Sequence, residues 1–551
     1  MAKLSGFLVL KRLQVDPGLR RVAICAIAFW LVTLVLVLNR YYSFYTTFDQ
    51  GIFNQVFWNS WRGDLFQSSL SSSLSTDVVQ DGQVPEVFYR RLGQHFTPAL
   101  LLWVPIYGLF QSAAFLSTLQ VTLVAIAGLV LYALARRHLP PHLATLIVAS
   151  YYGANAVIGP ALSNFNDLCQ IPLFVFSLLL ALEKRQWLWV VVMTVVLLAV
   201  REDAGVVLFG IGCYLALSRR SPRVGLVLCS LSFVYMVWLT TAVMPQFSQD
   251  IPRRFLVERF DQFVEGEETS TLNVIGSFLS RPWLLIVELI SPVPQTLQYL
   301  LGHWLPLAFI PVVSPAAWVM ASFPLAQILL QEGDGAIVIN MRYAITIIPG
   351  LFYGTILWCE QHQAWLKRSL VRRIWIGCIS LSLLFSLTSN PHQSLYFVAP
   401  ESFRPWVYMT LPKQWHHAGQ IRSLLARIPN DASVSATTEL VPALSSRREV
   451  LRYPGRHLRN DEEQVVEVDY IVADLWGPLQ YQAAFDSKRE FLQQTTPFID
   501  LLVEEADYGL VGCQQGVVLF QRGVPSEPDA IAAWQTFHPQ LDPVLQQRDS
   551  S

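Results

Sequence analysis

The sequence predicts an α-helical protein that crosses a membrane many times and carries a small α/β domain at its C-terminal end. Hydrophobic residues make up 53% of the 551 residues and charged residues only 14%, whereas soluble domains carry about 25% charged residues. Long apolar runs recur through the N-terminal two thirds, and the 17 tryptophans contribute to aromatic clusters at their ends. From about residue 391 the polar residues increase and the apolar runs shorten to strand length.

The basic residues set the expected orientation in the membrane. Five lysines and arginines precede the first apolar run, so we expect the N-terminus in the cytoplasm, and later turns on that side are basic as well. The apolar runs predict about eleven spans, which puts the C-terminal domain outside the cytoplasm. The spans are expected at residues 22–40, 113–135, 142–162, 168–182, 187–200, 204–218, 224–244, 296–313, 315–330, 343–359 and 374–389.

These spans define the expected domains. Residues 1–390 form the transmembrane domain, with a first outer loop at 41–112 and a second large outer loop at 245–295. Residues 391–525 form the extracytoplasmic α/β domain, and residues 526–551 are expected to be a flexible tail. Within the α/β domain we predict strands at 432–436, 449–453 and 468–474, and a hairpin from 508–513 and 517–521.

Several classes of partner and cofactor are disfavoured by composition. The net charge of −1 gives no basic surface for nucleic acid. The seven cysteines are scattered without CxxC pairs, which is typical of small core residues. Metal-ligand spacing and glycine-rich phosphate loops are not found, so we expect no cofactor, and a divalent cation is not evident from the sequence. Membrane lipid is the expected environment.

A stretch from Phe48 to Asn59, directly after the first apolar run, is the first candidate for a functional site. Its apolar residues recur at helical spacing, which predicts a short amphipathic helix lying on the membrane surface. Asp49 stands at the helix start and has two interpretations, an ordinary cap for exposed N–H groups or the catalytic carboxylate. Residues 97–110 are too short for a span, and we expect a second interfacial helix there, beginning near Pro98.

Other candidate residues fall at the outer ends of spans. The triplet Arg201-Glu202-Asp203 lies between two apolar segments that are short for a span, where ionisable residues usually face a cavity; a tight turn with self-paired charges is the alternative. Snorkelling towards head groups would explain an arginine at a span's end, and a structural hydrogen bond would explain an interfacial histidine. The candidate substrate-binding residues are His95, Asn166, Asp167, Arg201, Glu202, Asp203, Arg342 and Tyr343.

These residue types suit one kind of chemistry. A carboxylate at the water–lipid boundary acts as a general base on an acceptor hydroxyl, and a nearby arginine stabilises a phosphate leaving group. This describes transfer of a sugar from a polyprenyl-phosphate carrier to an acceptor. A transporter or flippase of lipid-linked substrates is a second hypothesis, although no internal repeat is visible. A catalytically silent scaffold for envelope assembly is the third.

Three motifs resemble a bacterial multi-pass membrane family designated as a domain of unknown function. They are Phe48-Asp49-Gln50-Gly51-Ile52-Phe53-Asn54-Gln55, Leu92-Gly93-Gln94-His95-Phe96-Thr97-Pro98 and Arg201-Glu202-Asp203-Ala204-Gly205, joined by Leu305-Pro306, Ser314-Pro315 and Arg342-Tyr343. The resemblance covers roughly residues 40–390 and the α/β tail, and it implies a bacterial inner or plasma membrane. One departure is the second outer loop, where the family often has a DFHP-like motif and this chain reads Asn164-Phe165-Asn166-Asp167-Leu168-Cys169-Gln170.

That family is similar to the GT-C-fold glycosyltransferases, such as protein mannosyltransferases and the aminoarabinose lipid A transferase. The similarity implies a GT-C-like transmembrane domain in which the first outer loop carries the catalytic acidic residue between interfacial helices. Asp49 matches that position. The resemblance therefore implies a glycosyltransferase that uses a polyprenyl-phosphate-linked sugar donor and an unknown acceptor on the outer face of the membrane.

Overall fold

The computed structural model describes residues 16–75, 78–79, 82–248, 276, 280–331, 337–505 and 507–546. The chain divides into two units. Unit 1 comprises Met1–Val37, Leu92–Trp103 and Ser117–His392, and unit 2 comprises Leu38–Arg91, Val104–Leu116 and Gln393–Ser551. The expected boundary near residue 390 lies close to the change of unit at Gln393. Most of the expected first outer loop belongs to unit 2 with the C-terminal domain.

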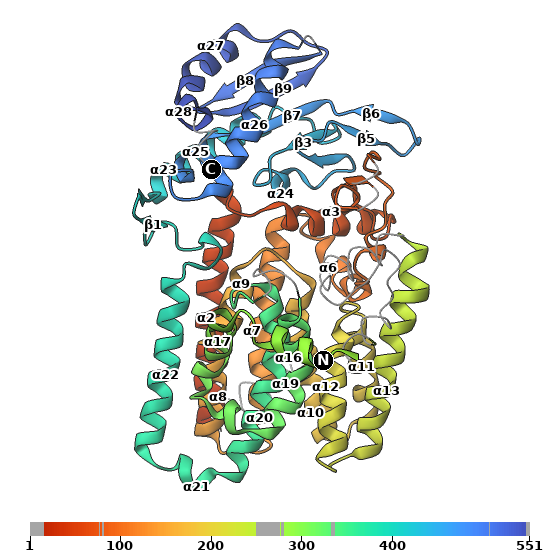
Figure 1. Ribbon diagram of the computed structural model, residues 1–551, viewed down its shortest axis with the longest axis vertical. Helices are drawn as coiled ribbons and strands as arrows, with labels where there is room; N and C mark the ends of the chain where they lie inside the picture. The colour runs from red at the N-terminus through yellow and green to blue at the C-terminus, as the bar shows by residue number, and fades with distance from the viewer. Residues whose placement is uncertain are drawn as a thin grey trace. The chain divides into compact units, whose positions relative to one another are not determined.

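Unit 1 is helical in its described residues (Figure 1). Its main helices are α2 (Pro17–Tyr42, shared with unit 2 at its end), α7 (Ala113–Ala135), α8 (Pro141–Tyr152), α9 (Asn155–Leu162), α10 (Ile171–Glu183), α11 (Trp187–Leu198), α12 (Ala204–Leu217), α13 (Pro222–Trp238), α16 (Pro282–Ile290), α17 (Val293–Trp304), α19 (Pro315–Leu329), α20 (Ile348–Gln361) and α22 (Ser369–Thr388). Shorter helical turns include η2 (Pro98–Leu102), η3 (Asp167–Gln170), η8 (Leu305–Leu307) and η9 (Arg342–Thr346).

Length and composition identify the helices that can cross a membrane. Among the described residues, five helices qualify: Pro17–Tyr42, Ala113–Ala135, Pro222–Gln246, Arg342–Gln361 and Ser369–Thr388. Two bent pairs, α8 with α9 and α16 with the segment Val293–Leu307, raise the number to seven if each pair is one span. Three further apolar helices, α11, α12 and α19, are shorter than a full span. The expected total of about eleven spans therefore stays a prediction. The second outer loop was expected at 245–295, but its described C-terminal part is the apolar helix α16 and the start of α17, and residues 249–275 lie outside the described part.

Close packing joins α12 and α13, which run side by side (Figure 1). Gly225 of α13 lies against α12, and a Cβ atom there would come within 2.5 Å of the Ala216 backbone nitrogen. Only glycine allows the two backbones this approach, as is common between helices in a membrane. α12 in turn packs on α19, so the N-terminal end of α12 is held in a fixed place within unit 1.

Unit 2 contains a five-stranded sheet with strand order β4-β3-β7-β9-β8. The strands are β3 (Val434–Ala436), β4 (Val450–Arg452), β7 (Tyr470–Asp474), β8 (Tyr508–Gln514) and β9 (Val517–Arg522). β3 pairs in parallel with β4 and β7, whereas β9 is antiparallel to both β7 and β8. The strands and the hairpin predicted from the sequence are confirmed within a few residues.

Both faces of this sheet are buried by helices. Along β7, Ile471 and Ala473 join one hydrophobic cluster, and Tyr470 and Val472 join another, as the two-residue period of a strand requires. The helices α25 (Trp476–Tyr481), α26 (Asp486–Glu504) and α27 (Pro528–Phe537) contribute to the first cluster, and α23 (Leu411–Leu425) contributes to the second. Unit 2 is therefore an α/β domain with helices on both faces of one mixed sheet.

The helix predicted after residue 48 is confirmed as α3 (Phe48–Arg62). Its environment differs from the expected membrane surface, because nearly all of its residues are buried inside unit 2. The polar side is occupied by hydrogen bonds, such as those from Asn54 Nδ2 to Ser445 Oγ (2.9 Å) and from Gln55 Nε2 to the Arg448 carbonyl (2.9 Å). The second interfacial helix is also shorter than expected, since residues 97–110 form η2 and the turn α6 (Val104–Tyr107).

The expected flexible tail is wrong for residues 528–545. This segment forms α27, the turn η11 (His538–Gln540) and α28 (Asp542–Leu545). Trp534, Phe537, Leu541 and Val544 are buried in the hydrophobic cluster on one face of the sheet. The segment is therefore part of the folded α/β domain.

Candidate functional site

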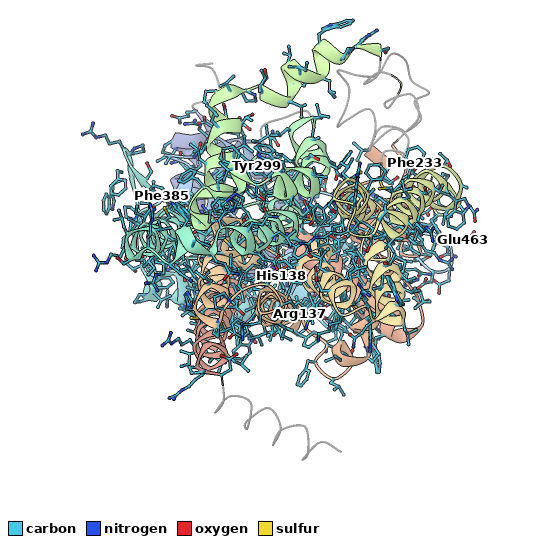
Figure 2. All side chains as sticks on the ribbon, turned by 90° about the horizontal axis from the view of Figure 1, so that it is seen from below. Arg137, His138, Phe233, Tyr299, Phe385 and Glu463 are labelled. Atoms are coloured by element: carbon cyan, nitrogen blue, oxygen red, sulfur yellow. The ribbon has the colours of Figure 1, made fainter. Side chains whose placement is uncertain are left out.

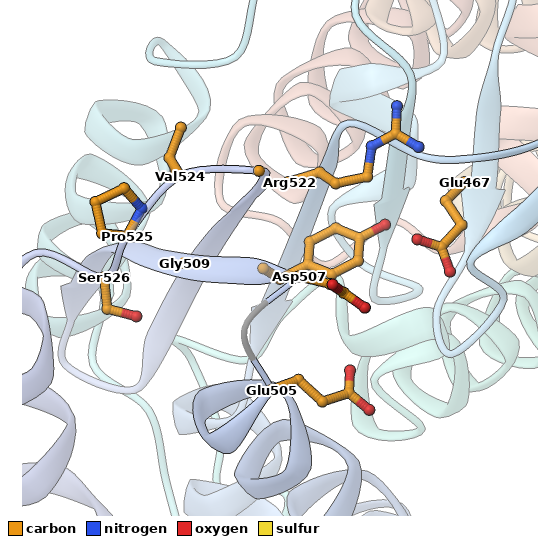
Figure 3. A pocket seen from close by; sticks show the side chains of 10 residues that line it. Glu467, Glu505, Asp507, Gly509, Arg522, Val524, Pro525 and Ser526 are labelled. Carbon is orange, nitrogen blue, oxygen red and sulfur yellow. The ribbon is translucent and has the colours of Figure 1, made fainter.

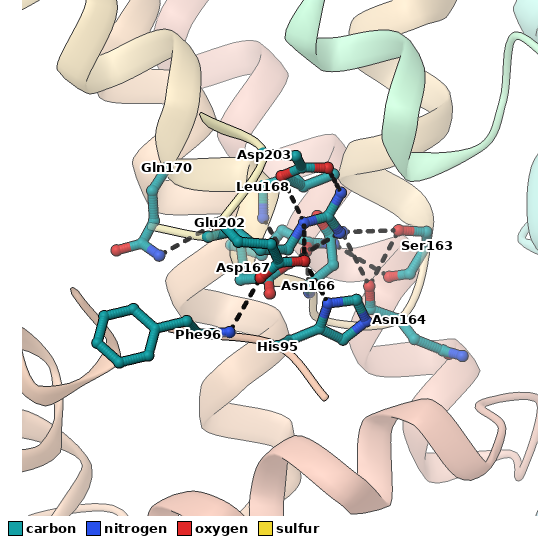
Figure 4. Close-up of polar contacts among 12 residues, drawn as sticks. His95, Phe96, Ser163, Asn164, Asn166, Asp167, Leu168, Gln170, Glu202 and Asp203 are labelled. Atoms are coloured by element: carbon teal, nitrogen blue, oxygen red, sulfur yellow. Dashed lines mark hydrogen bonds and ion pairs between the residues drawn. The ribbon is translucent and has the colours of Figure 1, made fainter. Parts of the chain in front are cut away.

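A buried cluster of charged groups surrounds the turn between α11 and α12 in unit 1 (Figure 4). The turn carries the triplet Arg201-Glu202-Asp203 between two short apolar helices. Asp203 takes the N-cap position of α12 but makes no capping bond with its side chain. Its carboxylate instead accepts hydrogen bonds from the guanidinium group of Arg201, with a distance of 2.7 Å from Nε to Oδ1. The pairing within the triplet that the sequence left as an alternative is thus part of a larger cluster.

Arg201 forms the centre of this cluster. Its guanidinium group forks onto Asp203 and lies 3.7 Å from Asp167 Oδ1 and 3.9 Å from Glu202 Oε1. The residue is only 2% exposed. Burial alone would lower the pKa of Arg201, but the surrounding carboxylates raise it well above its ordinary value. Arg201 therefore keeps a permanent positive charge that compensates buried acidic groups.

Glu202 connects the cluster to the segment before η2. Glu202 Oε1 lies 2.8 Å from His95 Nδ1, and Glu202 Oε2 accepts a hydrogen bond of 2.9 Å from the N–H of Phe96. A further bond from the Ala99 N–H to the Ala199 carbonyl, 2.8 Å long, holds this segment against the turn. His95 is thereby fixed beside Glu202, and its side chain is 18% exposed.

The surroundings change the acidity of Glu202. Burial and the negative charge of Asp203 raise the pKa of Glu202 from 4.5 to about 7, although Arg201 and two backbone N–H groups act in the opposite direction. A carboxyl group with this pKa exchanges its proton near neutral pH. When Glu202 is ionised, it accepts the Nδ1–H of His95, and Nε2 is then the basic nitrogen of the neutral ring.

Asn166 and Asp167 border the cluster at the start of η3. Gln120 Oε1, from the middle of α7, accepts hydrogen bonds from the backbone N–H (3.0 Å) and from Nδ2 (2.9 Å) of Asn166. Asp167 Oδ1 accepts the N–H of Leu168 at 3.0 Å. Among the described residues, Asn166 Oδ1 and Asp167 Oδ2 are buried without a hydrogen-bond partner. Two acceptor oxygens are therefore available to a donor group that is not part of the described chain.

Tyr343 links Arg201 to Arg342. The Tyr343 ring centroid lies 5.5 Å from the Cζ atom of each arginine, a distance typical of cation–π contacts. In contrast to Arg201, Arg342 is partly exposed. The eight predicted substrate-binding residues thus lie together in unit 1, at the ends of five helical elements or loops. No described group of three or more His, Cys, Asp or Glu residues has a geometry for holding a metal ion.

The comparison with protein families covers most of both units. Residues 40–519 match the family described as "Predicted membrane protein (DUF2079)". The chain belongs to the DUF2079 family. The predicted resemblance to a multi-pass membrane family is therefore confirmed, and the apolar helices of unit 1 agree with the description of the DUF2079 proteins as membrane proteins. No curated protein matches the chain.

Two solved structures match this DUF2079 chain over most of its length. The first is the archaeal oligosaccharyltransferase AglB from Archaeoglobus fulgidus in complex with an inhibitory peptide and a dolichol-phosphate, with a TM-score of 0.42, 11% sequence identity, and coverage of 96% of this chain and 78% of that one. The second is the Archaeoglobus fulgidus oligosaccharyltransferase in complex with Zn and sulfate, with a TM-score of 0.40, 11% identity, and coverage of 90% and 73%.

Asp49 lies in unit 2, apart from the unit that contains the charged cluster. It is the second residue of α3, is partly exposed, and lies in the first turn of the helix, where Thr47 takes the cap position. A carboxylate in the first helical turn interacts favourably with the helix dipole. The catalytic role of Asp49 stays a prediction.

Two residues of the site escaped the sequence analysis. Gln120 orients Asn166 from the middle of α7, and Gln327 of α19 donates a hydrogen bond of 3.2 Å to Asp203 Oδ2. Each is an isolated amide in an apolar helix, and this was the only available signal.

A hollow of about 730 Å³ in unit 2 is bordered by Glu467, Glu505, Asp507 and Arg522 (Figure 3) and contains none of the predicted site residues.

Proposed function

We propose that the chain is a GT-C-type membrane glycosyltransferase that moves a sugar from a polyprenyl-phosphate carrier to an acceptor on the outer face of the membrane. The observation that carries this proposal is the contact of 2.8 Å between His95 Nδ1 and Glu202 Oε1 in a cluster where burial raises the pKa of Glu202 to about 7. Membership in a membrane-protein family and the resemblance of the motifs to GT-C enzymes support the same function.

The reaction needs a base and a group that stabilises the departing phosphate. In the proposed step, the acceptor hydroxyl oxygen bonds to the anomeric carbon of the sugar while the bond from that carbon to the carrier phosphate oxygen breaks. His95 Nε2 takes the hydroxyl proton, and Glu202 stabilises the resulting imidazolium. The polyprenyl phosphate leaves with the electron pair, and Arg342 compensates its developing charge.

The unpartnered oxygens of Asn166 and Asp167 support a sugar as the transferred group. Both oxygens are acceptors, and a sugar offers several hydroxyl donors. Arg201 serves this site indirectly, because it is enclosed by carboxylates and holds them in place. Asp49 is the alternative base, proposed from the resemblance of its position in the first outer loop.

A turnover assay tests the proposal. Purified protein in lipid vesicles is offered polyprenyl-phosphate sugars with a panel of hydroxyl and amine acceptors, and release of polyprenyl phosphate is measured from pH 5 to 9. Wild type, Glu202→Gln, Asp49→Asn and the control Glu490→Gln, which changes an exposed carboxylate of α26, are compared. We expect Glu202→Gln to lower turnover about 10²- to 10⁴-fold, as loss of general base catalysis does.

The results separate the alternatives. Loss of turnover in Asp49→Asn alone would assign the base to Asp49 instead of the His95–Glu202 pair. Equal turnover in all four proteins would contradict both assignments. If wild type releases no polyprenyl phosphate with any acceptor, the glycosyltransferase proposal fails and the envelope scaffold becomes the better hypothesis; transport of a lipid-linked sugar in the same vesicles would identify a flippase.

A further inference from the structure

A groove of about 960 Å³ lies between α17 and α22 in unit 1, apart from the His95–Glu202 pair. The two helices run in opposite directions along it. Trp375 Nε1 of α22 donates a hydrogen bond of 3.1 Å to the Pro306 carbonyl just after α17, which brings the end of α17 beside the first half of α22. Since each helix rises 1.5 Å per residue, the start of α17 then lies near the end of α22.

This arrangement gives the groove two chemically different ends. Gln295 and Gln298 at the start of α17 line the groove together with Thr388 and Ser389, where α22 ends. The opposite end, beside the end of α17, is lined by the apolar side chains of Leu305 and Phe309. The groove is therefore amphipathic along its length, as a site for a lipid with its head group near the helix ends would be.

The apolar walls open towards the surface of the helix bundle. Leu297 and Leu301 of α17 and Leu381 and Phe385 of α22 line the groove and are all more than 40% exposed. Figure 2 labels Phe385 at the periphery of the helices. α22 is long and apolar enough to cross a membrane, and α17 reaches that length only together with α16, across a bend of 68°. Exposed apolar side chains on such segments suit contact with hydrocarbon.

The polar end contains unsatisfied hydrogen-bonding groups. Asn155, 9% exposed at the start of α9, and Asn340 line the groove, and the Oδ1 atom of each is buried without a hydrogen-bond partner among the described residues. The Tyr299 hydroxyl is also buried without a hydrogen-bond partner among the described residues. Asn340 Nδ2 donates to Ser389 Oγ at 3.4 Å, which leaves Oδ1 as the acceptor. These buried oxygens require a donor.

Asn340 approaches this end because α9 has a glycine there. A Cβ atom on Gly159 would lie 2.9 Å from Asn340 Oδ1 and 2.6 Å from its Cα atom, so a larger residue would displace Asn340. Asn155 is four residues before Gly159 and shares its face of the helix. The two acceptor oxygens therefore converge on the polar end from neighbouring elements.

We propose that this groove binds one bilayer phospholipid with a primary ammonium head group, of the phosphatidylethanolamine type. The ammonium group has three N–H donors for the oxygens of Asn155 and Asn340, while amides of Gln295 and Gln298 suit the phosphate. A choline head group has no N–H donor. An anionic head group would lack compensation, since none of the described lining residues is charged. The proposal does not depend on the proposed enzymatic activity.

Lipid retention tests this selectivity in the full-length protein. The protein is reconstituted in nanodiscs with equal amounts of phosphatidylethanolamine, phosphatidylcholine and phosphatidylglycerol, extracted gently, and examined by native mass spectrometry. We expect wild type to retain the ethanolamine lipid about tenfold over the choline lipid, as the loss of one hydrogen bond to a charged group predicts. Retention should decrease stepwise with N-methyl and N,N-dimethyl ethanolamine lipids, a series that needs no variant.

Two variants separate the head-group contacts from the hydrocarbon contacts. Asn155→Leu with Asn340→Leu should bring the ratio of the ethanolamine to the choline lipid close to one. Phe385→Ala, which removes an apolar wall, should reduce retention of both lipids and leave their ratio unchanged. Equal retention by wild type, a preference for phosphatidylglycerol, absence of retained lipid, or displacement by polyprenyl phosphate at equal concentration would each overturn the proposal.

Discussion

Replacement of Glu202 by glutamine should stabilise the protein at alkaline pH while it removes activity. The pKa of Glu202 rises from 4.5 to about 7 in the folded protein, chiefly because the side chain is buried. At 1.36 kcal/mol for each pH unit, this shift corresponds to about 3 kcal/mol. The unfolded chain releases the proton first as pH rises, so the contribution is fully present below pH 4.5 and is lost as pH rises through about 7.

The variant has no ionisable group at this position and should not show this loss. Thermal unfolding in nanodiscs, followed by tryptophan fluorescence, should give similar Tm values for wild type and Glu202→Gln at pH 5. At pH 8 the Tm of the variant should be higher by about 3 °C, because about 3 kcal/mol is divided by an unfolding entropy of about 2.1 cal/mol/K for each residue of a chain of this size. The control Glu490→Gln should follow wild type at every pH.

One result would refute this reasoning. If wild type and Glu202→Gln lose the same Tm between pH 5 and pH 8, Glu202 is ionised in the folded protein throughout that range. The pair with His95 would then be an ordinary ion pair, and its proposed role as a base would lose its support. A higher Tm with lost turnover is instead the combination typical of functional residues held at a cost in stability.

Three further predictions concern other charged groups. Arg201→Met leaves two buried carboxylates and the partly buried Asp203 without their cation and should destabilise unit 1 by about 3–5 kcal/mol at pH 8, with partial recovery of Tm at pH 5 as carboxylates protonate. Arg342→Gln should leave Tm unchanged and raise the KM for a polyprenyl-phosphate sugar about tenfold or more, because a partly exposed arginine contributes mainly to phosphate binding. Asp474→Asn breaks a buried pair with His417, 3.0 Å long, and should make unit 2 cleavable by protease at lower temperature. Burial raises the pKa of Asp474, but His417 and the N–H groups of Trp476 and Gly477 outweigh burial and lower it overall, so wild type should lose this advantage as pH falls below about 4.

The charged triplet could be recognised from the sequence because membrane helices rarely place three ionisable residues in one turn. Arg201, Glu202 and Asp203 interrupt two apolar segments, and only a cavity or mutual pairing makes this arrangement tolerable. The sequence did not indicate that both conditions hold at once. The bond between Glu202 and His95 joins residues 107 positions apart, and such a contact has no local signature.

The burial of α3 shows the same limit. The polar residues Asn54 and Gln55 are compatible with the solvent-exposed face of a surface helix. In the folded chain they instead donate hydrogen bonds to Ser445 and to the Arg448 carbonyl, about 390 positions away. The C-terminal helix α27 is different, because its signal was present. Ala530, Trp534 and Phe537 follow helical spacing, and all three are buried.

The two arginines of the site have different physical tasks, and burial decides between them. Arg201 is enclosed by Asp167, Glu202 and Asp203, so a phosphate could reach it only by displacing carboxylates that already satisfy its charge. Arg342 contacts the same Tyr343 ring and is partly exposed. The triplet that marks the site in the sequence is therefore its support. The proposed function therefore assigns substrate contact to the more exposed groups around it, His95 and Arg342.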